Sequence, residues 1–226
     1  LKQLTQKLKT IAQTNGIPFY DANTLENTIA DGLRAKGVTG EIITSNDRTH
    51  PTRTGDTILA YCILRSQGVD GIVAKTEIDA LNSDIKKKNA DISELSMTTD
   101  GGSFKYSPQA IPLAYNDRYK NAEKFVPDFT DMLNNEIISI KNLNEGNYDI
   151  TLEGQTIGTY SASELSSGIN IATLSQNPNQ AKALNNYNLL ADKKAETNKL
   201  RAVALAESFG VTPDDYSTED RLAQFK

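Results

Sequence analysis

The stretch Asn46-Asp47-Arg48-Thr49-His50-Pro51 organises the chain, because it contains the only histidine among the 226 residues. Histidine has an unperturbed pKa near neutral pH, and it is the usual general base in hydrolytic reactions. A carboxylate three residues earlier on a tight loop can reach one ring nitrogen, fix the ring's tautomer and stabilise the imidazolium. The spacing therefore predicts that Asp47 orients His50 as a general base. The alternative is a solvated loop histidine with a chance acidic neighbour.

The segments around this loop predict an α/β domain. Apolar spacing indicates a helix that ends at Asn15-Gly16 and a second helix over about 25–35. Between them, residues 17–20 (Ile-Pro-Phe-Tyr) are typical of a short buried strand. After Pro51 we expect a helix over about 54–66, with Thr54 as its cap. This order is typical of a parallel sheet, at whose edge reactive groups gather.

The middle of the chain changes character. Residues 76–95 are polar and predict a helix, so the basic run Lys86-Lys87-Lys88 is interpreted as a solvated helix face. Residues 96–108 predict two strands around a turn at Gly101-Gly102. The apolar pattern after Pro127 predicts another helix.

The last third predicts a small β unit followed by helices. Alternating residues over 148–152 and 156–160, with a turn at Glu153-Gly154-Gln155, indicate a β-hairpin. Ser161 with Glu164 three positions later predicts a capping box at the start of a short helix. A long helix is expected from Pro178 to about Phe209.

Composition and charge exclude several classes of protein. The 38% hydrophobic and 23% charged fractions are ordinary for a globular protein, and the net charge of −5 argues against nucleic acid as the main partner. No apolar run is long enough for a transmembrane helix. The single cysteine, Cys62, lies in an apolar helical pattern and predicts a buried, inert thiol. With one histidine and one cysteine, we expect no zinc site of the usual ligands, and no cofactor is indicated.

Two motifs resemble one enzyme family. Asp47-Arg48-Thr49-His50-Pro51, followed by Gly55 and a helix, resembles the last block of the SGNH (GDSL-like) hydrolases, which reads Asp-x-x-His-Pro. The runs from Tyr148 to Gly158 and from Ser161 to Ala172 resemble a C-terminal extension of one bacterial branch of that family, in which a small β unit precedes a Gly-Ile-Asn-Leu-Ala stretch.

The resemblance implies a Ser-His-Asp ester hydrolase in which His50 is the general base and Asp47 orients it. The family's nucleophile and oxyanion hole belong to Gly-Asp-Ser and Gly-x-Asn-Asp blocks that precede the histidine, and neither block occurs before Asp47. Gly55-Asp56-Thr57 and Ala114-Tyr115-Asn116-Asp117 resemble these blocks, but both follow the histidine, so we interpret them as helix starts or loops. Each missing oxyanion donor is commonly worth ~3 kcal/mol of transition-state stabilisation.

We therefore expect the C-terminal half of a flavodoxin-like, three-layer SGNH hydrolase, inactive alone. Its predicted parts are residues 1–125 (hydrolase domain), 126–174 (a small β-rich unit) and 175–226 (a helical segment). The expected partners are an N-terminal half, as a separate chain or as further residues, and a substrate such as an O-acylated carbohydrate or another small ester. The branch of the family implies export, to the periplasm or beyond.

Two other interpretations remain. The chain is either a non-catalytic module that binds carbohydrate or protein, or a degenerate hydrolase without its nucleophile. Five tyrosines would supply aromatic surface for a binding module, although core tyrosines are commoner: Tyr106, Tyr115, Tyr119, Tyr148 and Tyr160. An exposed His50 with Asp47 turned away would favour the module, whereas a bonded pair beside an open cleft would favour the hydrolase.

Overall fold

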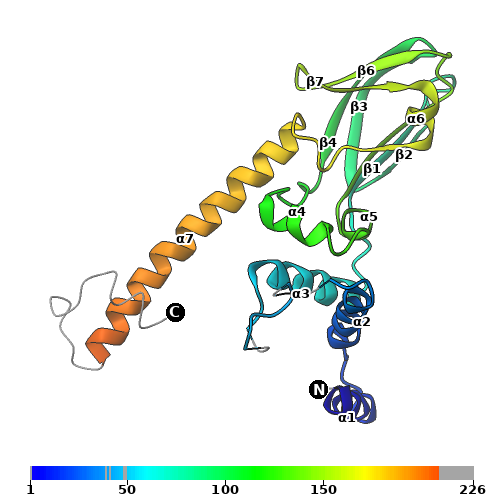
Figure 1. Cartoon of the computed structure of the whole chain (residues 1–226). Helices are drawn as coiled ribbons and strands as arrows, with labels where there is room; N and C mark the ends of the chain where they lie inside the picture. The colour runs from blue at the N-terminus through cyan, green and yellow to red at the C-terminus, as the bar shows by residue number, and fades with distance from the viewer. Residues whose placement is uncertain (1, 39, 41, 48–49, 209–226) are drawn as a thin grey trace. The chain divides into compact units, whose positions relative to one another are not determined.

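The computed structural model describes residues 2–38, 40, 42–47 and 50–208. The chain divides after Ala183 into two compact units. Residues 1–183 form the large unit, and residues 184–226 form the second unit. The mixture of helices and sheets (Figure 1) confirms the α/β class, with its β-rich unit and its long C-terminal helix. The three-part division of the chain stays a prediction.

The first part of the large unit is helical. Its three helices are α1 (Lys2–Thr14), α2 (Ala22–Ala35) and α3 (Arg53–Ser66). The first two agree with the sequence. The strand expected at 17–20 is wrong: this segment pairs with no other described strand, and Ile17 is 58% exposed. An extended segment becomes a strand only where a neighbour accepts its backbone hydrogen bonds.

Strands replace the helix expected over 76–95. They are β1 (Ile72–Asp79), β2 (Ile85–Lys88) and β3 (Ala90–Thr98). Lys86, Lys87 and Lys88 therefore lie on an exposed strand, not on a helix face. Strand pairing overrides the helical propensity of this polar segment, and lysines on an edge strand also hinder pairing with other chains.

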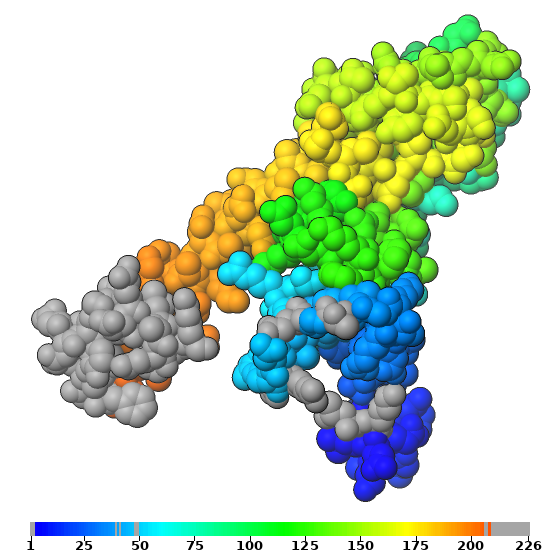
Figure 2. Space-filling model, in the orientation of Figure 1, coloured from blue at the N-terminus to red at the C-terminus, as the bar shows by residue number. Residues whose placement is uncertain are grey.

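The remaining elements follow in chain order. They are β4 (Gly101–Pro108), α4 (Asp117–Glu123), α5 (Phe129–Leu133), β5 (Asn135–Lys141), β6 (Asn147–Leu152), β7 (Gln155–Ser161), α6 (Ala162–Ser167), β8 (Ile169–Asn170) and α7 (Pro178–Ser208). The hairpin β6–β7 and the capping box of α6 are confirmed. In Figure 2 the atoms of β6, β7 and α6 form one continuous surface.

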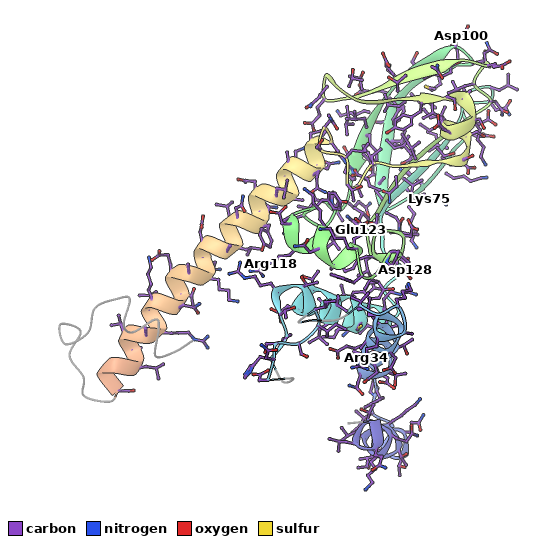
Figure 3. All side chains as sticks on the ribbon, in the orientation of Figure 1. Arg34, Lys75, Asp100, Arg118, Glu123 and Asp128 are labelled. Carbon is purple, nitrogen blue, oxygen red and sulfur yellow. The ribbon has the colours of Figure 1, made fainter. Side chains whose placement is uncertain are left out.

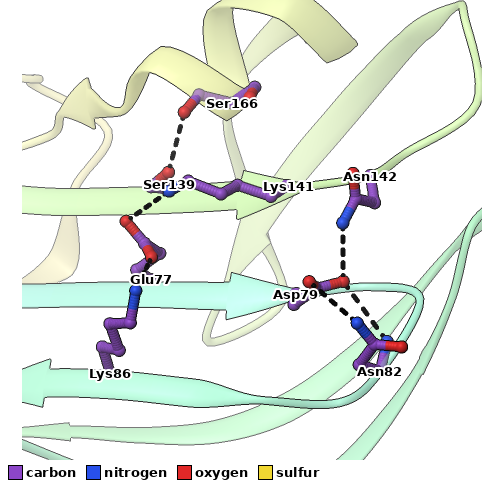
Figure 4. Close-up of polar contacts among 8 residues, drawn as sticks. All are labelled: Glu77, Asp79, Asn82, Lys86, Ser139, Lys141, Asn142 and Ser166. Atoms are coloured by element: carbon purple, nitrogen blue, oxygen red, sulfur yellow. Dashed lines mark hydrogen bonds and ion pairs between the residues drawn. The ribbon is translucent and has the colours of Figure 1, made fainter.

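The strands form one larger sheet and two hairpins. The larger sheet has the order β2-β1-β5-β8, in which β1 and β5 pair in parallel and the other neighbours are antiparallel. The hairpins are β3–β4 and β6–β7. Ion pairs cross the larger sheet, because Glu77 of β1 contacts Lys86 of β2 at 3.0 Å and Lys141 of β5 at 2.8 Å (Figure 4).

Two apolar clusters hold the large unit together. One joins α3 to α4 and α5, with Ile58, Tyr61, Cys62, Tyr119 and Phe129 among its members. Polar contacts lie beside it: Tyr61 donates to Asp128 at 3.2 Å, and Tyr115 donates to Glu123 at 2.8 Å (the two carboxylates are labelled in Figure 3). The other cluster lies among the strands and α6, with Leu165 and Ile171 fully buried. The predicted catalytic loop therefore leads into a helix that is anchored in a core.

The second unit continues α7 from Leu184. Most of its described side chains from Leu184 to Ser208 are exposed, including Leu189, Leu190 and Leu200. The long helix that the sequence predicted is confirmed through Ser208. Residues 209–226 lie outside the described part of the chain.

Candidate active site

The loop that carries His50 is closed by backbone hydrogen bonds. A bridge joins Thr44 to Pro51, and the Ser45 N–H donates to the His50 carbonyl at 2.9 Å. One step further out, the Thr52 N–H donates to the Ile43 carbonyl at 3.0 Å. The two sides of the loop are therefore held together immediately before α3 begins.

The start of α3 fixes the loop to the helix. Thr52, not Thr54, is the N-cap: its hydroxyl accepts from the Gly55 N–H at 2.9 Å and donates to the Ile42 carbonyl. Gly55 allows the close approach, because a Cβ at this position would lie 1.8 Å from the Ile43 carbonyl oxygen. The predicted cap at Thr54 is wrong because Thr52 has the extended backbone that a cap requires.

Asp47 and His50 are hydrogen-bonded through their side chains. His50 Nδ1 lies 2.5 Å from Asp47 Oδ2, the contact that the three-residue spacing predicted. The other carboxylate oxygen, Oδ1, accepts from the backbone N–H of His50 at 3.0 Å and from the Ser45 hydroxyl at 2.7 Å. A carboxylate on Nδ1 places the neutral ring's proton on that atom, which leaves a lone pair on Nε2.

The electrostatics of the pair favour the imidazolium. The hydrogen bond to Asp47, and then the negative charge of that residue, raise the pKa of His50 above 6.5. Both side chains face water, with exposed fractions of 81% for His50 and 48% for Asp47. The ring is thus oriented and accessible, as a general base must be.

A hollow borders the same loop. Its volume is about 790 Å³, and it lies between one face of α2 and the loop. Arg34, labelled in Figure 3, lines it from α2, and Ser45 and Asn46 line it from the loop. Neither Asp47 nor His50 lines this hollow, and His50 is bonded to Asp47 but exposed. The arrangement therefore combines a feature of the hydrolase with one of the binding module, and the catalytic roles of the pair stay predictions.

The two segments that resemble family blocks are helix starts in the structure. Gly55-Asp56-Thr57 lies in the first turns of α3, where the Thr57 hydroxyl donates to the Arg53 carbonyl at 3.2 Å. Asn116 caps α4 by accepting from the Tyr119 N–H at 3.1 Å. These positions agree with the structural roles expected for both segments.

Ser45 is the site residue that sequence reasoning missed. Its hydroxyl contacts Asp47 in a turn, and the signal available was its position two residues before an aspartate. Cys62 is fully buried, as the sequence predicted, and burial raises the pKa of its thiol to about 12.

The described residues contain neither a candidate metal site nor a candidate membrane span. In the described ranges, no group of three or more His, Cys, Asp or Glu residues is placed to hold a metal ion. Among the helices described, none is long and apolar enough to cross a membrane.

The chain is similar to a solved enzyme structure. No family model and no curated protein matches the chain. A solved structure, BT4096, a gut microbial diltiazem-metabolizing enzyme, is similar with a TM-score of 0.75 and 27% sequence identity. The alignment covers 91% of this chain but 48% of BT4096, so the chain spans about half the length of that enzyme.

Proposed function

We propose that this chain supplies the histidine and aspartate of a serine ester hydrolase of the SGNH type. The observation that carries the proposal is the 2.5 Å contact between His50 Nδ1 and Asp47 Oδ2 in a loop that reads Asp-x-x-His-Pro. Similarity to an enzyme, BT4096, over about half of that protein's length supports it.

The proposed reaction is acyl transfer. A serine from the other half attacks the ester carbonyl while His50 Nε2 takes its proton, and the imidazolium then returns that proton to the leaving alcohol. Water, deprotonated by the same nitrogen, releases the acid. Asp47 holds the ring by Nδ1 and stabilises its positive charge in both steps. The proposed substrates are O-acylated carbohydrates or other small esters.

The proposed partner is the N-terminal half of the same hydrolase. Apolar side chains on α1 support this, because Leu4, Leu8 and Ile11 are 48–57% exposed although they share one helix face. Exposed apolar side chains in a row are typical of a surface that another segment covers.

The function is tested with an aryl acetate substrate and a fluorophosphonate, which labels activated serines. We expect the 226-residue chain alone to show neither serine labelling nor hydrolysis beyond that of free imidazole. Co-expression with a polypeptide that carries the family's Gly-Asp-Ser block should produce both. Asp47→Asn should then reduce kcat by several orders of magnitude. Hydrolysis by the chain alone that Asp47→Asn leaves unchanged would contradict the assigned roles.

A second candidate, a binding module, is favoured by a different cavity. A volume of about 500 Å³ lies between the hairpins β3–β4 and β6–β7, within the range of small-molecule sites. The cavity is lined by the aromatic side chains of Phe104, Tyr106 and Tyr148 and by the aliphatic side chains of Ile138 and Leu165. Tyr119, another of the five tyrosines that would supply aromatic surface, is a core residue.

The NMR signals of the tyrosine rings test whether the chain is a binding module. If the module binds carbohydrate, millimolar oligosaccharide should shift the NMR signals of Tyr106 and Tyr148 but not that of buried Tyr119. Unchanged Tyr106 and Tyr148 signals would contradict carbohydrate binding in this cavity.

A further inference from the structure

We propose that Ser45 is a positioning residue for the Asp47–His50 pair. Its hydroxyl holds the Asp47 carboxylate in the rotation that presents Oδ2 to the imidazole. The inference deepens the proposed function and rests on it for its catalytic meaning, but the positioning itself is measurable without catalysis.

The carboxylate requires such a restraint. The terminal torsion of an aspartate has broad minima, so the two oxygens exchange places or tilt at little energetic cost. Asp47 is half exposed, so water competes for both oxygens. Among the described residues of the loop, the Ser45 hydroxyl at 2.7 Å and the His50 N–H at 3.0 Å both donate to Oδ1. With Oδ1 held on both sides, Oδ2 is directed at Nδ1.

Ser45 is itself a fixed donor. Its backbone N–H donates to the His50 carbonyl at 2.9 Å, and its neighbour Thr44 forms the bridge to Pro51. The serine and the histidine are therefore joined twice, once by the backbone and once through the carboxylate. Ser45→Ala or Ser45→Val removes the hydroxyl and keeps the backbone bond, so the contribution of the hydroxyl can be isolated.

The alternative is a local contact that stabilises the turn alone. Serine hydroxyls next to aspartates commonly make such bonds. The two interpretations differ in one observable. A turn contact changes the stability of the loop, whereas a positioning contact also changes the ionisation and the tautomer of the His50 ring.

The sole histidine makes the measurement direct, because a chain labelled with ¹⁵N-histidine has one pair of imidazole signals. In the described residues, Asp47 is the group whose charge acts on that ring. We expect the native chain to titrate above 6.5, with the Nδ1–H tautomer dominant at high pH. Asp47→Asn should abolish both features. Ser45→Ala should move the pKa and the tautomer ratio toward those of Asp47→Asn.

Matched variants isolate the hydroxyl. Ser45→Thr and Ser45→Val have nearly the same shape, but only threonine keeps the donor. We expect Ser45→Thr to retain the native titration and Ser45→Val to resemble Ser45→Ala. Native titration in both Ser45→Ala and Ser45→Val would overturn the proposal, and so would a Ser45→Thr chain that behaves like Ser45→Val. Circular dichroism verifies folding, and the Thr/Val comparison suffices if Ser45→Ala does not fold.

Activity separates this inference from the proposed function. In the completed hydrolase, Ser45→Ala should reduce kcat by about tenfold and leave KM unchanged, since a mispositioned base forfeits part of its catalytic effect. A titration that depends on Ser45 in a protein without esterase activity would refute the proposed function and leave the positioning role intact. Esterase activity together with a His50 titration that Ser45→Ala leaves unchanged would refute the positioning role and leave the proposed function intact.

Discussion

At the scale of single residues, the site consists of contacts within six positions of the chain. Ser45, Asp47 and His50 meet because the loop closes on itself, and no distant element is required for their hydrogen bonds. The exposed position of the ring leaves it open to a substrate or to a nucleophile from another segment. The chemistry of the pair is consequently measurable in this chain alone.

The pH dependence of stability should report the Asp47–His50 pair. Because the folded pKa of His50 is raised, the pair stabilises the fold below about 6.5, the unfolded pKa. This contribution is lost as the pH rises through the folded value. We therefore expect Asp47→Asn to lower the melting temperature more at pH 6 than at pH 9, by differential scanning calorimetry. An equal reduction at both pH values would show that the ion pair contributes nothing.

At the scale of elements, the beginning of α3 connects the loop to the core. Thr52 caps the helix and reaches back to Ile42, while Gly55 lets the helix approach Ile43. Further along α3, Ile58, Tyr61 and Cys62 are buried. Because α3 packs into the core and is bonded to the loop at its start, it restrains the loop that holds His50.

Removal of the cap should destabilise this connection. Thr52→Ala leaves the Gly55 N–H without its acceptor and should cost about 1 kcal/mol of unfolding free energy. Thr52→Ser keeps the oxygen and should cost less. Thr57→Ala, on the same helix, is the control and should lie within about 0.5 kcal/mol of the native chain. Urea unfolding measures all three, and equal values for the two alanine variants would contradict the role of Thr52 as the cap.

A side chain at Gly55 should have no space. Gly55→Ala places a Cβ against the Ile43 backbone and should destabilise the fold by about 1–3 kcal/mol. Gly32→Ala is the matched control, because Gly32 also lies in a helix and its Cβ would meet nothing within 4 Å. It should be neutral or stabilising by up to about 1 kcal/mol. Thermal denaturation distinguishes the pair, and a stabilising Gly55→Ala would contradict the close contact.

At the scale of the whole molecule, a buried carboxylate joins distant segments of the large unit. Glu136 of β5 is fully buried and accepts from Tyr106 of β4 at 3.0 Å. It also accepts from Asn177 at 2.8 Å and from Asn179 at 2.7 Å, where α7 begins. One carboxylate thereby satisfies three donors from two other parts of the chain, of which Asn177 and Asn179 are buried.

Loss of Glu136 should be costly. Glu136→Ala leaves these donors without an acceptor and should reduce the unfolding free energy by about 3 kcal/mol or more, whereas Tyr106→Phe removes one bond and should cost about 1 kcal/mol. Glu145→Ala, at an exposed position, is the control. Urea titrations give all three values. A Glu136→Ala variant as stable as the control would show that the network contributes nothing.

The sequence by itself determined the features in which the interacting residues are close together in the chain. The Asp47–His50 contact, the capping box of α6 and the hairpin β6–β7 each depend on residues a few positions apart. Short-range chemistry fixes such features, because closing a small loop costs little entropy.

Tertiary structure decided the features that depend on distant partners. β1 is a strand because it pairs with β5, about 60 positions later, and this pairing overrides the polar, helix-prone composition of the segment. The segment 17–20 is not a strand because, among the described residues, no neighbour pairs with it. The carboxylate of Glu136 acquired its role in the same way, because its donors Tyr106, Asn177 and Asn179 are distant from it in the chain.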